Sequence, residues 1–233
     1  MCFGTLASFA AVPVHINSGN PAYPFPQFLE YACGGNLGTN NPEGLTHAEM
    51  EQLIRTAYQQ HANEFEYTKD EYEGIKYIWT PYKAAYDCSE GDGYALLAAA
   101  YMADKVTFDG YWMCTHDKRR VHTKRYKDCT DNAPNYPYGE FAISDGADEG
   151  GNTAADGDVD VALALYVAYK QWGEFMRNDK GEVVKDACGN PISYKQEMIN
   201  VVRGLVAMST NHPGINPLPV NTGLIGQIGR AHV

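Results

Sequence analysis

The chain has 233 residues, of which 44% are hydrophobic, and it carries 29 acidic against 18 basic side chains, a formal net charge of −11. A chain of this length and composition can bury one large core. Its acidity opposes binding to nucleic acid or to an anionic lipid surface, so we expect neither kind of partner.

The first residues of the chain form a short apolar stretch. Residues 1–12 end in small side chains but lack a basic start, and we interpret them as the remnant of a signal peptide. No apolar run approaches the roughly 20 residues that span a bilayer. We therefore expect a secreted protein, either extracellular or periplasmic, with no membrane-spanning segment.

The six cysteines include no C-x-x-C pair, which argues against a zinc ribbon or a thioredoxin motif. They are Cys2, Cys33, Cys88, Cys114, Cys129 and Cys188. For a secreted protein we expect one or two disulfides, and a Cys114–Cys129 bridge would close the basic loop between them; six reduced thiols are the alternative. His116 and His122 flank this loop and are expected to be solvated.

In chain order, residues 13–45 are rich in Pro, Gly and Asn and predict an irregular arm laid over a core. Thr46-His47-Ala48-Glu49 has the form of a capping box and predicts a helix start. A second helix is predicted from Ser89, with a neighbouring helix around residues 107–114. Residues 131–155 predict a long loop, with a short strand at 141–143.

The second half of the chain is also helical in pattern. Residues 158–172 are apolar nearly all round, which predicts a helix buried on every side. A turn at 178–181 and a small hairpin through 189–191 precede a last helix over 194–208. Helices that alternate between apolar and amphipathic predict an all-α domain with an inner and an outer layer; a compact helical bundle is the alternative.

Two acidic, glycine-flanked segments stand at predicted helix starts. Ser89-Glu90-Gly91-Asp92-Gly93-Tyr94 opens one helix, and Asp156-Gly157-Asp158-Val159-Asp160 opens another. Hydrolysis of a glycosidic bond needs a protonated carboxylic acid beside the leaving oxygen and further carboxylates around the sugar, because the transition state carries oxocarbenium charge. The 17 tyrosines and three tryptophans also suit a sugar polymer, although core packing is the alternative for most of them.

These segments resemble glycoside hydrolase family 8, a bacterial family of endoglucanases, xylanases and chitosanases with an (α/α)6 barrel. The resemblance begins near Tyr86 and includes Phe108-Asp109, Trp112 and residues 154–172. The chain departs from the family pattern at Ala155, where Ser or Thr is usual, and at Val161, where Ile or Met is expected. Neither change removes a carboxylate.

The resemblance implies an inverting mechanism in which Glu90 is the general acid and Asp156 binds and distorts the sugar. The alternative for Glu90 is a purely structural place at the helix N-terminus. A helix N-terminus favours the charged carboxylate, whereas a general acid needs apolar burial to keep its proton. Substrate contacts are expected from Tyr94, Trp79, Trp112 and Asp158. For Asp158 and Asp160 the alternative is bonding to free helix amides.

The resemblance implies no cofactor and no metal. The D-x-D-x-D spacing from Asp156 lacks the sixth-position Gly and the twelfth-position Glu of an EF-hand loop. We expect a monomer whose partner is a polysaccharide. The expected reaction is hydrolysis of β-1,4-glycosidic bonds in a plant-type polysaccharide, and the favoured substrate is cellulose or β-glucan. A xylanase or chitosanase of the same family, or a carbohydrate-binding protein without hydrolysis, is the alternative.

In this family the base that activates water lies well C-terminal of the Asp-Gly-Asp block, whereas 77 residues follow Asp156. Residues 228–233 can be encoded by a common sequencing-adapter sequence, and we interpret them as read-through. We therefore expect residues 13–227 to be a partial catalytic domain, an incomplete (α/α)6 barrel that lacks its C-terminal helices and is inactive alone.

Overall fold

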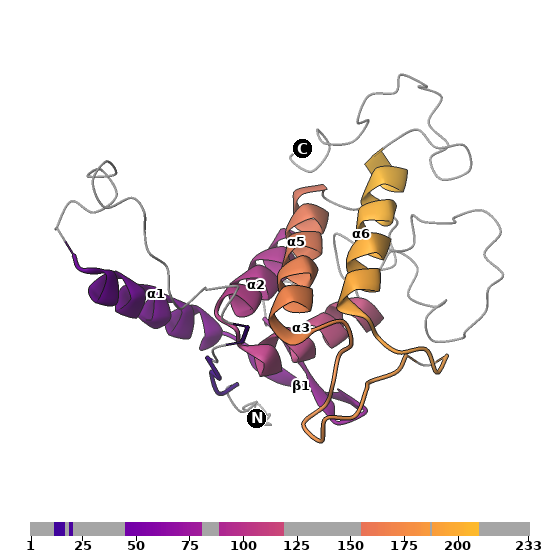
Figure 1. Cartoon of the computed structure of the whole chain (residues 1–233), viewed down its shortest axis with the longest axis horizontal. Helices are drawn as coiled ribbons and strands as arrows, with labels where there is room; N and C mark the ends of the chain where they lie inside the picture. Colours follow the sequence, from indigo (N-terminus) through magenta and orange to yellow (C-terminus); the bar gives the residue numbers. More distant parts are fainter. Residues whose placement is uncertain are drawn as a thin grey trace, which may run out of the picture.

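The computed structural model describes residues 12–16, 19–20, 45–80, 89–118, 155–186 and 188–209. In order, the elements are α1 (His47–Ala62), β1 (Glu66–Tyr72), β2 (Ile75–Trp79), α2 (Ser89–Tyr101), α3 (Lys105–Lys118), α5 (Ala155–Trp172) and α6 (Tyr194–Ser209). Helix α5 packs between α2 and α6, while α3 contacts α2 and β2 (Figure 1). The predicted strand at 141–143 and the segments 1–11 and 228–233 lie outside the described residues.

Helix α1 begins where the sequence predicts it. The Glu49 amide donates to Thr46 Oγ1 at 3.3 Å, and the Thr46 amide donates to Glu49 Oε2 at 2.8 Å, which completes the capping box. Near the other end of the helix, the Tyr58 hydroxyl donates to Asp104 Oδ2 at 3.0 Å. This bond ties α1 to the start of α3.

The antiparallel hairpin of β1 and β2 is absent from the sequence prediction. Its two turn residues, Glu73 and Gly74, have φ angles of 48° and 87°, the left-handed pair that a two-residue hairpin turn requires. The hairpin packs on α3 through Gly110, where an added β-carbon would lie 2.5 Å from the Lys76 carbonyl oxygen. Only glycine allows β2 to approach α3 this closely.

The N-terminal arm lies over the core in its described part, as predicted. Val12 is buried. The His15 amide donates to Asp104 Oδ2 at 3.2 Å, and the Asn20 amide donates to Gln171 Oε1 at 2.8 Å. The arm therefore bridges the start of α3 and the end of α5.

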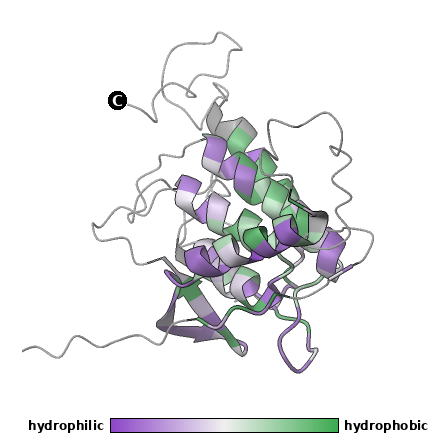
Figure 2. Cartoon of the chain, turned by 90° about the vertical axis from the view of Figure 1, so that its left-hand side faces the viewer, coloured by the Kyte–Doolittle hydropathy of each residue, from purple (hydrophilic) through white to green (hydrophobic). Residues whose placement is uncertain are grey.

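The core is built from large side chains contributed by every layer. Phe108 is fully buried, and its ring centroid lies 5.3 Å from that of Trp172 and 5.8 Å from that of Tyr194. The largest fully buried side chains are Trp112, Tyr194, Phe65, Phe108, Ile78, Leu96, Met113, Leu165 and Met176. In Figure 2 hydrophobic residues gather within the helical layer, while hydrophilic residues are prominent on the hairpin.

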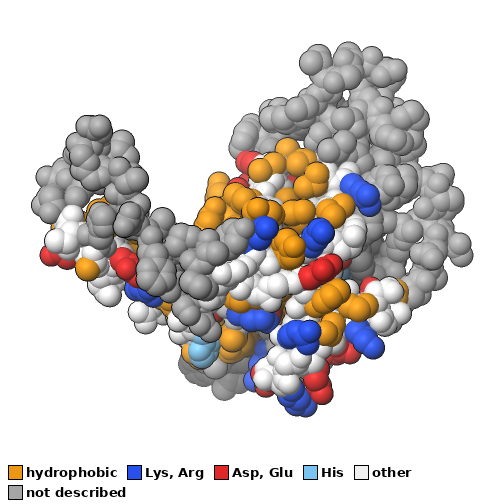
Figure 3. All heavy atoms as spheres, viewed as in Figure 1, with side chains coloured by type: hydrophobic (Ala, Val, Ile, Leu, Met, Phe, Trp, Pro, Cys, Tyr) orange, Lys and Arg blue, Asp and Glu red, His pale blue; other side chains and the backbone are white. Residues whose placement is uncertain are grey.

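Helix α5 differs from its prediction in two ways. It begins at Ala155, three residues earlier than predicted, so that Asp156 lies inside its first turn. Val159, Leu163 and Tyr166 are 51%, 40% and 41% exposed, so the prediction of burial on every side is wrong. Spacings of four and three residues place them on one face of the helix, and Figure 3 shows hydrophobic atoms gathered over this region. Packing against α2 and α6 covers only the other faces of α5.

The predicted turn, hairpin and last helix are confirmed. The side chain of Asn178 closes the turn by accepting from the Lys180 and Glu182 amides, and bridges join residues 175–193, 177–183 and 185–191. Within the described part, no helix is long and apolar enough to cross a membrane.

The expected Cys114–Cys129 bridge is wrong. Cys114 is a thiol outside any disulfide, and its side chain points from α3 into the core, where it is 8% exposed. Cys188 is disulfide-bonded. The expectation of at least one disulfide therefore agrees with the structure, but not through Cys114.

Candidate active site

The first turns of α2 and α5 meet through glycine. A β-carbon added to Gly157 would lie 2.6 Å from both the carbonyl carbon and Oγ of Ser89. One added to Gly93 would lie 2.7 Å from the β-carbon of Asp160 and 3.1 Å from the Gly157 carbonyl oxygen. Real side chains do not tolerate such contacts, so these glycines let the two acidic segments come together.

Glu90 stands next to this contact, in the first turn of α2. Its side chain is half-buried, and its Oε2 atom is buried without a hydrogen-bond partner among the described residues. A buried polar atom normally has a partner, so an orphaned carboxyl oxygen needs an explanation such as a catalytic role. The first turn of α2 therefore holds a carboxyl oxygen that no described residue satisfies.

Asp156 is exposed in the first turn of α5, and its Oδ1 accepts from the Gly157 amide at 3.1 Å. Asp160 lies one turn further along the same face. Burial, and secondarily the nearby Asp156 carboxylate, raise the pKa of Asp160 above its ordinary value of 3.8. Asp156 and Asp160 are therefore close enough for the charge of one to oppose ionisation of the other.

Of the two exposed aromatic candidates, one lies beside the acidic segments. Tyr94 is 59% exposed and stands four residues after Glu90, on the same face of α2. Trp79 is 39% exposed at the end of β2, on the hairpin that packs against α3. The structure thus associates Tyr94 with the acidic segments, and it associates Trp79 with the neighbouring layer.

Two candidate substrate contacts are fully buried. Trp112 and Asp158 both have 0% exposure, and the Trp112 ring packs edge-on against His116, with centroids 5.7 Å apart. A ring enclosed by the core presents no face to a sugar. The stacking role expected for Trp112 and the direct sugar contact expected for Asp158 are therefore not supported by this structure, because both side chains point inward from their helices.

His116 was expected to be solvated, and this is wrong. It is 2% exposed. Its Nδ1 lies 2.7 Å from Asp117 Oδ1, and its Nε2 lies 3.9 Å from Glu197 Oε2 on α6. The other Asp117 oxygen accepts a hydrogen bond from the Tyr77 hydroxyl. The network joins β2, α3 and α6, whereas His122 lies outside the described residues.

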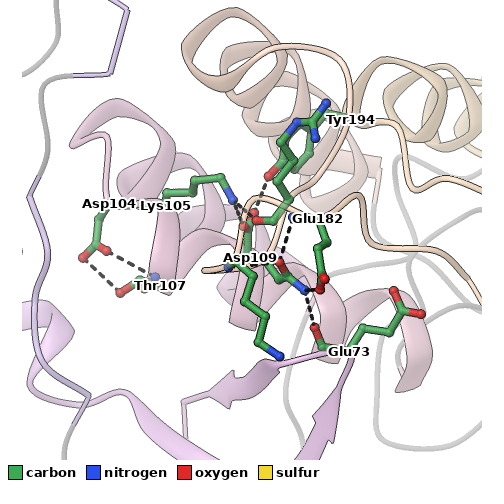
Figure 4. Close-up of polar contacts among 10 residues, drawn as sticks. Glu73, Asp104, Lys105, Thr107, Asp109, Glu182 and Tyr194 are labelled. Carbon is green, nitrogen blue, oxygen red and sulfur yellow. Dashed lines mark hydrogen bonds and ion pairs between the residues drawn. The ribbon is translucent and has the colours of Figure 1, made fainter.

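A second buried polar group lies at the start of α3 (Figure 4). Asp109 accepts from the Tyr194 hydroxyl at 2.5 Å and forms an ion pair with Lys105. Burial raises the pKa of the Asp109 carboxyl, an effect opposed by Lys105 and by the Tyr194 hydrogen bond. The sequence motifs give Asp109 no chemical role, and no local pattern identifies Tyr194 as its partner, because 85 residues separate them.

The arrangement of two paired helix starts, one carrying an orphaned buried carboxyl oxygen and the other an exposed carboxylate, suits acid catalysis on a glycoside. The model of Glycosyl hydrolases family 8 matches residues 52–209. The chain therefore belongs to this family of glycoside hydrolases, in agreement with the expected all-α, (α/α)6-barrel class.

The chain is also similar to individual proteins. A β-glucanase of Niallia circulans is 27% identical over 172 residues, which cover 71% of this chain and 38% of the relative. The match to the structure of a β-1,3-1,4-glucanase of Paenibacillus sp. X4 (20% identical, TM-score 0.46) covers 72% of this chain and 38% of the glucanase chain. The match to the structure of a xylanase of Teredinibacter turnerae in complex with xylohexaose (19% identical, TM-score 0.46) covers 68% of this chain and 38% of the xylanase chain. The chain thus spans 38% of the length of the curated relative that it matches.

Proposed function

We propose that this chain carries the acid side of an inverting glycosidase site that hydrolyses β-1,4 bonds of a polysaccharide. Glu90 is the general acid, and Asp156 is the carboxylate that binds and distorts the sugar at the point of cleavage. The meeting of the α2 and α5 first turns through Gly93 and Gly157 carries the proposal, because it brings residues 66 positions apart to one place.

The roles follow from what each carboxyl group already contacts. Glu90 Oε2 has no described partner, so the carboxyl proton is not committed to another described group, and the half-buried carboxyl group can donate it to a glycosidic oxygen at about 2.6–3.2 Å. Asp156 is held by the Gly157 amide through one oxygen and is exposed. Its negative charge can stabilise the positive charge that develops on the sugar ring.

An inverting site also needs a carboxylate that activates water, at roughly 6.5–9.5 Å from the acid. We do not assign this base to any described residue. Asp160 is a further carboxylate, but it lies on the same helix face as Asp156, whereas the acid and the base of an inverting site stand on opposite faces of the sugar ring. We propose that the base comes from residues outside the described part.

For the substrate we propose β-glucan, on the basis of the relative named β-glucanase. Xylan remains the second candidate, and chitosan the third because an acidic protein attracts a cationic polymer. We further propose that the protein is secreted and acts as a monomer. The disulfide at Cys188 supports an oxidising compartment.

A carbohydrate-binding protein without hydrolysis is the second candidate function. Exposed Tyr94 and exposed Asp156 provide an aromatic face and a hydrogen-bond acceptor, which are sufficient for binding. Reducing-sugar assays on β-glucan, xylan and chitosan distinguish the two functions, with Glu90→Gln as the matched variant. Release of sugar that depends on Glu90 supports the hydrolase. Saccharide binding without release supports the binding protein.

A further inference from the structure

A cavity lies beside the hairpin, and none of the residues that line it comes from α2 or α5. It has a volume of about 420 Å³ and is lined by the hairpin, the start of α3 and residues 177–179. Its walls include Tyr67, Lys76, Lys105, Val106, Arg177 and Asp179. Glu90 lies in the first turn of α2 and Asp156 in the first turn of α5, and neither lines this cavity, so the cavity is distinct from the proposed glycosidase site.

Two cationic side chains of this cavity form no ion pair within the described part of the chain. Lys76 is exposed, and its Nζ lies 5.6 Å from the centroid of the Tyr67 ring. Arg177 is also exposed, and its Nη1 donates to the Gly181 carbonyl at 2.8 Å. Both cations remain available to an anion, which is notable in a protein with a net charge of −11.

The other charges of the cavity are mostly compensated. Lys105 pairs with Asp109 and donates to the Arg177 carbonyl at 2.7 Å, while Asp109 also accepts from Tyr194. The exposed acidic side chain in the lining is Asp179. Lys105 and Val106 are the first residues of α3, where the helix dipole adds partial positive charge. The cavity therefore favours a ligand with a single negative charge.

The shape and the apolar lining identify the kind of anion. A volume of about 420 Å³ is within the range of small-molecule sites and is much larger than an inorganic anion. Tyr67, Ile75 and Val106 contribute apolar surface, which suits the apolar face of a pyranose ring and offers nothing to phosphate. A sugar with a carboxylate satisfies both the cationic and the apolar groups.

We propose that this cavity is a second saccharide site that binds a uronic acid, with the carboxylate held by Lys76 and Arg177 and the ring against Tyr67 and Val106. Such a site would recognise acidic units of a polysaccharide independently of cleavage. It goes beyond the proposed hydrolysis and does not require it.

The test is calorimetric titration of the full chain with glucuronic acid at low ionic strength, with glucose and inorganic phosphate as comparison ligands. Glucuronate should bind at least tenfold more tightly than glucose or phosphate. Lys76→Gln and Arg177→Gln should each weaken glucuronate binding roughly tenfold, since each removes a charge-assisted contact. Asp179→Asn should strengthen binding, because it removes the exposed negative charge from the lining.

Glu90→Gln is the control that separates the two sites, and it should leave glucuronate binding unchanged. Lys76 and Arg177 are exposed, so thermal unfolding of their variants should match that of the wild type. The proposal is overturned if glucose binds as tightly as glucuronate, if phosphate does, if both Gln variants at Lys76 and Arg177 bind normally, or if Glu90→Gln abolishes binding.

Discussion

Gly157 of α5 lies against Ser89 of α2 so closely that a β-carbon on Gly157 would stand 2.6 Å from the Ser89 carbonyl carbon. Glu90 follows Ser89 directly, and Asp156 precedes Gly157. The contact therefore places both carboxyl groups on neighbouring helix turns. Stability and site geometry are coupled at this point, because any change that separates the two turns also separates the carboxyl groups.

Gly157→Ala should destabilise the protein. Alanine favours a helix interior by about 1 kcal/mol over glycine, but overpacking against the Ser89 backbone should cost about 1–3 kcal/mol and outweigh this gain. Urea denaturation measures the difference. Val159→Ala, at an exposed position two residues later, should be close to neutral. A Gly157→Ala variant more stable than the wild type would contradict the close contact.

Asp104→Ala should have a large effect on stability because Asp104 joins three parts of the chain. Its carboxylate accepts from the His15 amide, the Tyr58 hydroxyl, and the Thr107 amide and hydroxyl. Removing it leaves these donors without their acceptor and should lower the free energy of unfolding by about 2–4 kcal/mol. Asp104→Asn keeps one acceptor oxygen, so its free energy of unfolding should fall by less. Equal losses in the two variants would argue against the hydrogen-bond account.

Asp160 should titrate above the ordinary Asp value of 3.8, since burial and Asp156 raise its pKa. Carboxyl-carbon NMR titration measures this directly, and Asp156→Asn should move the pKa of Asp160 back toward 3.8. The folded chain then holds this proton more tightly than the unfolded chain. The contribution of Asp160 to stability therefore falls as pH rises from about 3.8 to the folded pKa. An unchanged Asp160 titration in Asp156→Asn would show that the two groups do not interact.

Tyr94→Ala should weaken binding of a β-1,4-gluco-oligosaccharide, because it removes an exposed ring one turn from Glu90. The expected loss is about 1 kcal/mol, or several-fold in affinity. Tyr101 provides a matched control, since it is exposed seven residues further along α2 and lies at the far end of the helix. Tyr101→Ala should bind normally. Equal losses of affinity in Tyr94→Ala and Tyr101→Ala would contradict a binding site confined to the Glu90 end of α2.

Local sequence signals predicted the helix starts well, because a capping box or an acidic, glycine-flanked turn encodes its own geometry. Thr46 and Ser89 are examples. The β1–β2 hairpin was missed, although Glu73-Gly74 between alternating polar and apolar residues was a usable signal. The exposed face of α5 formed by Val159, Leu163 and Tyr166 was predicted to be buried. Composition shows that a helix is apolar, but it does not show which of its faces have a neighbour.

The candidate site was predicted unevenly for a similar reason. The acidic segments stood out because acid catalysis on a glycoside needs carboxyl groups, and their contact through Gly157 agrees with a shared location; Tyr94 lies beside them. Trp112 was placed in the site although its ring is buried, since an aromatic residue near a motif gives no sign of the direction of its side chain. The burial of His116 depends on Glu197, 81 positions away, and no local pattern contains that information.

The most direct test is the rate of reducing-sugar release from β-glucan by the wild type and by Glu90→Gln. A general acid contributes about 10²–10⁴-fold to the rate. Glu90→Gln should therefore lose at least a hundredfold in turnover while binding gluco-oligosaccharide with unchanged affinity. Hydrolysis by Glu90→Gln at the wild-type rate would contradict the assignment of Glu90 as the acid.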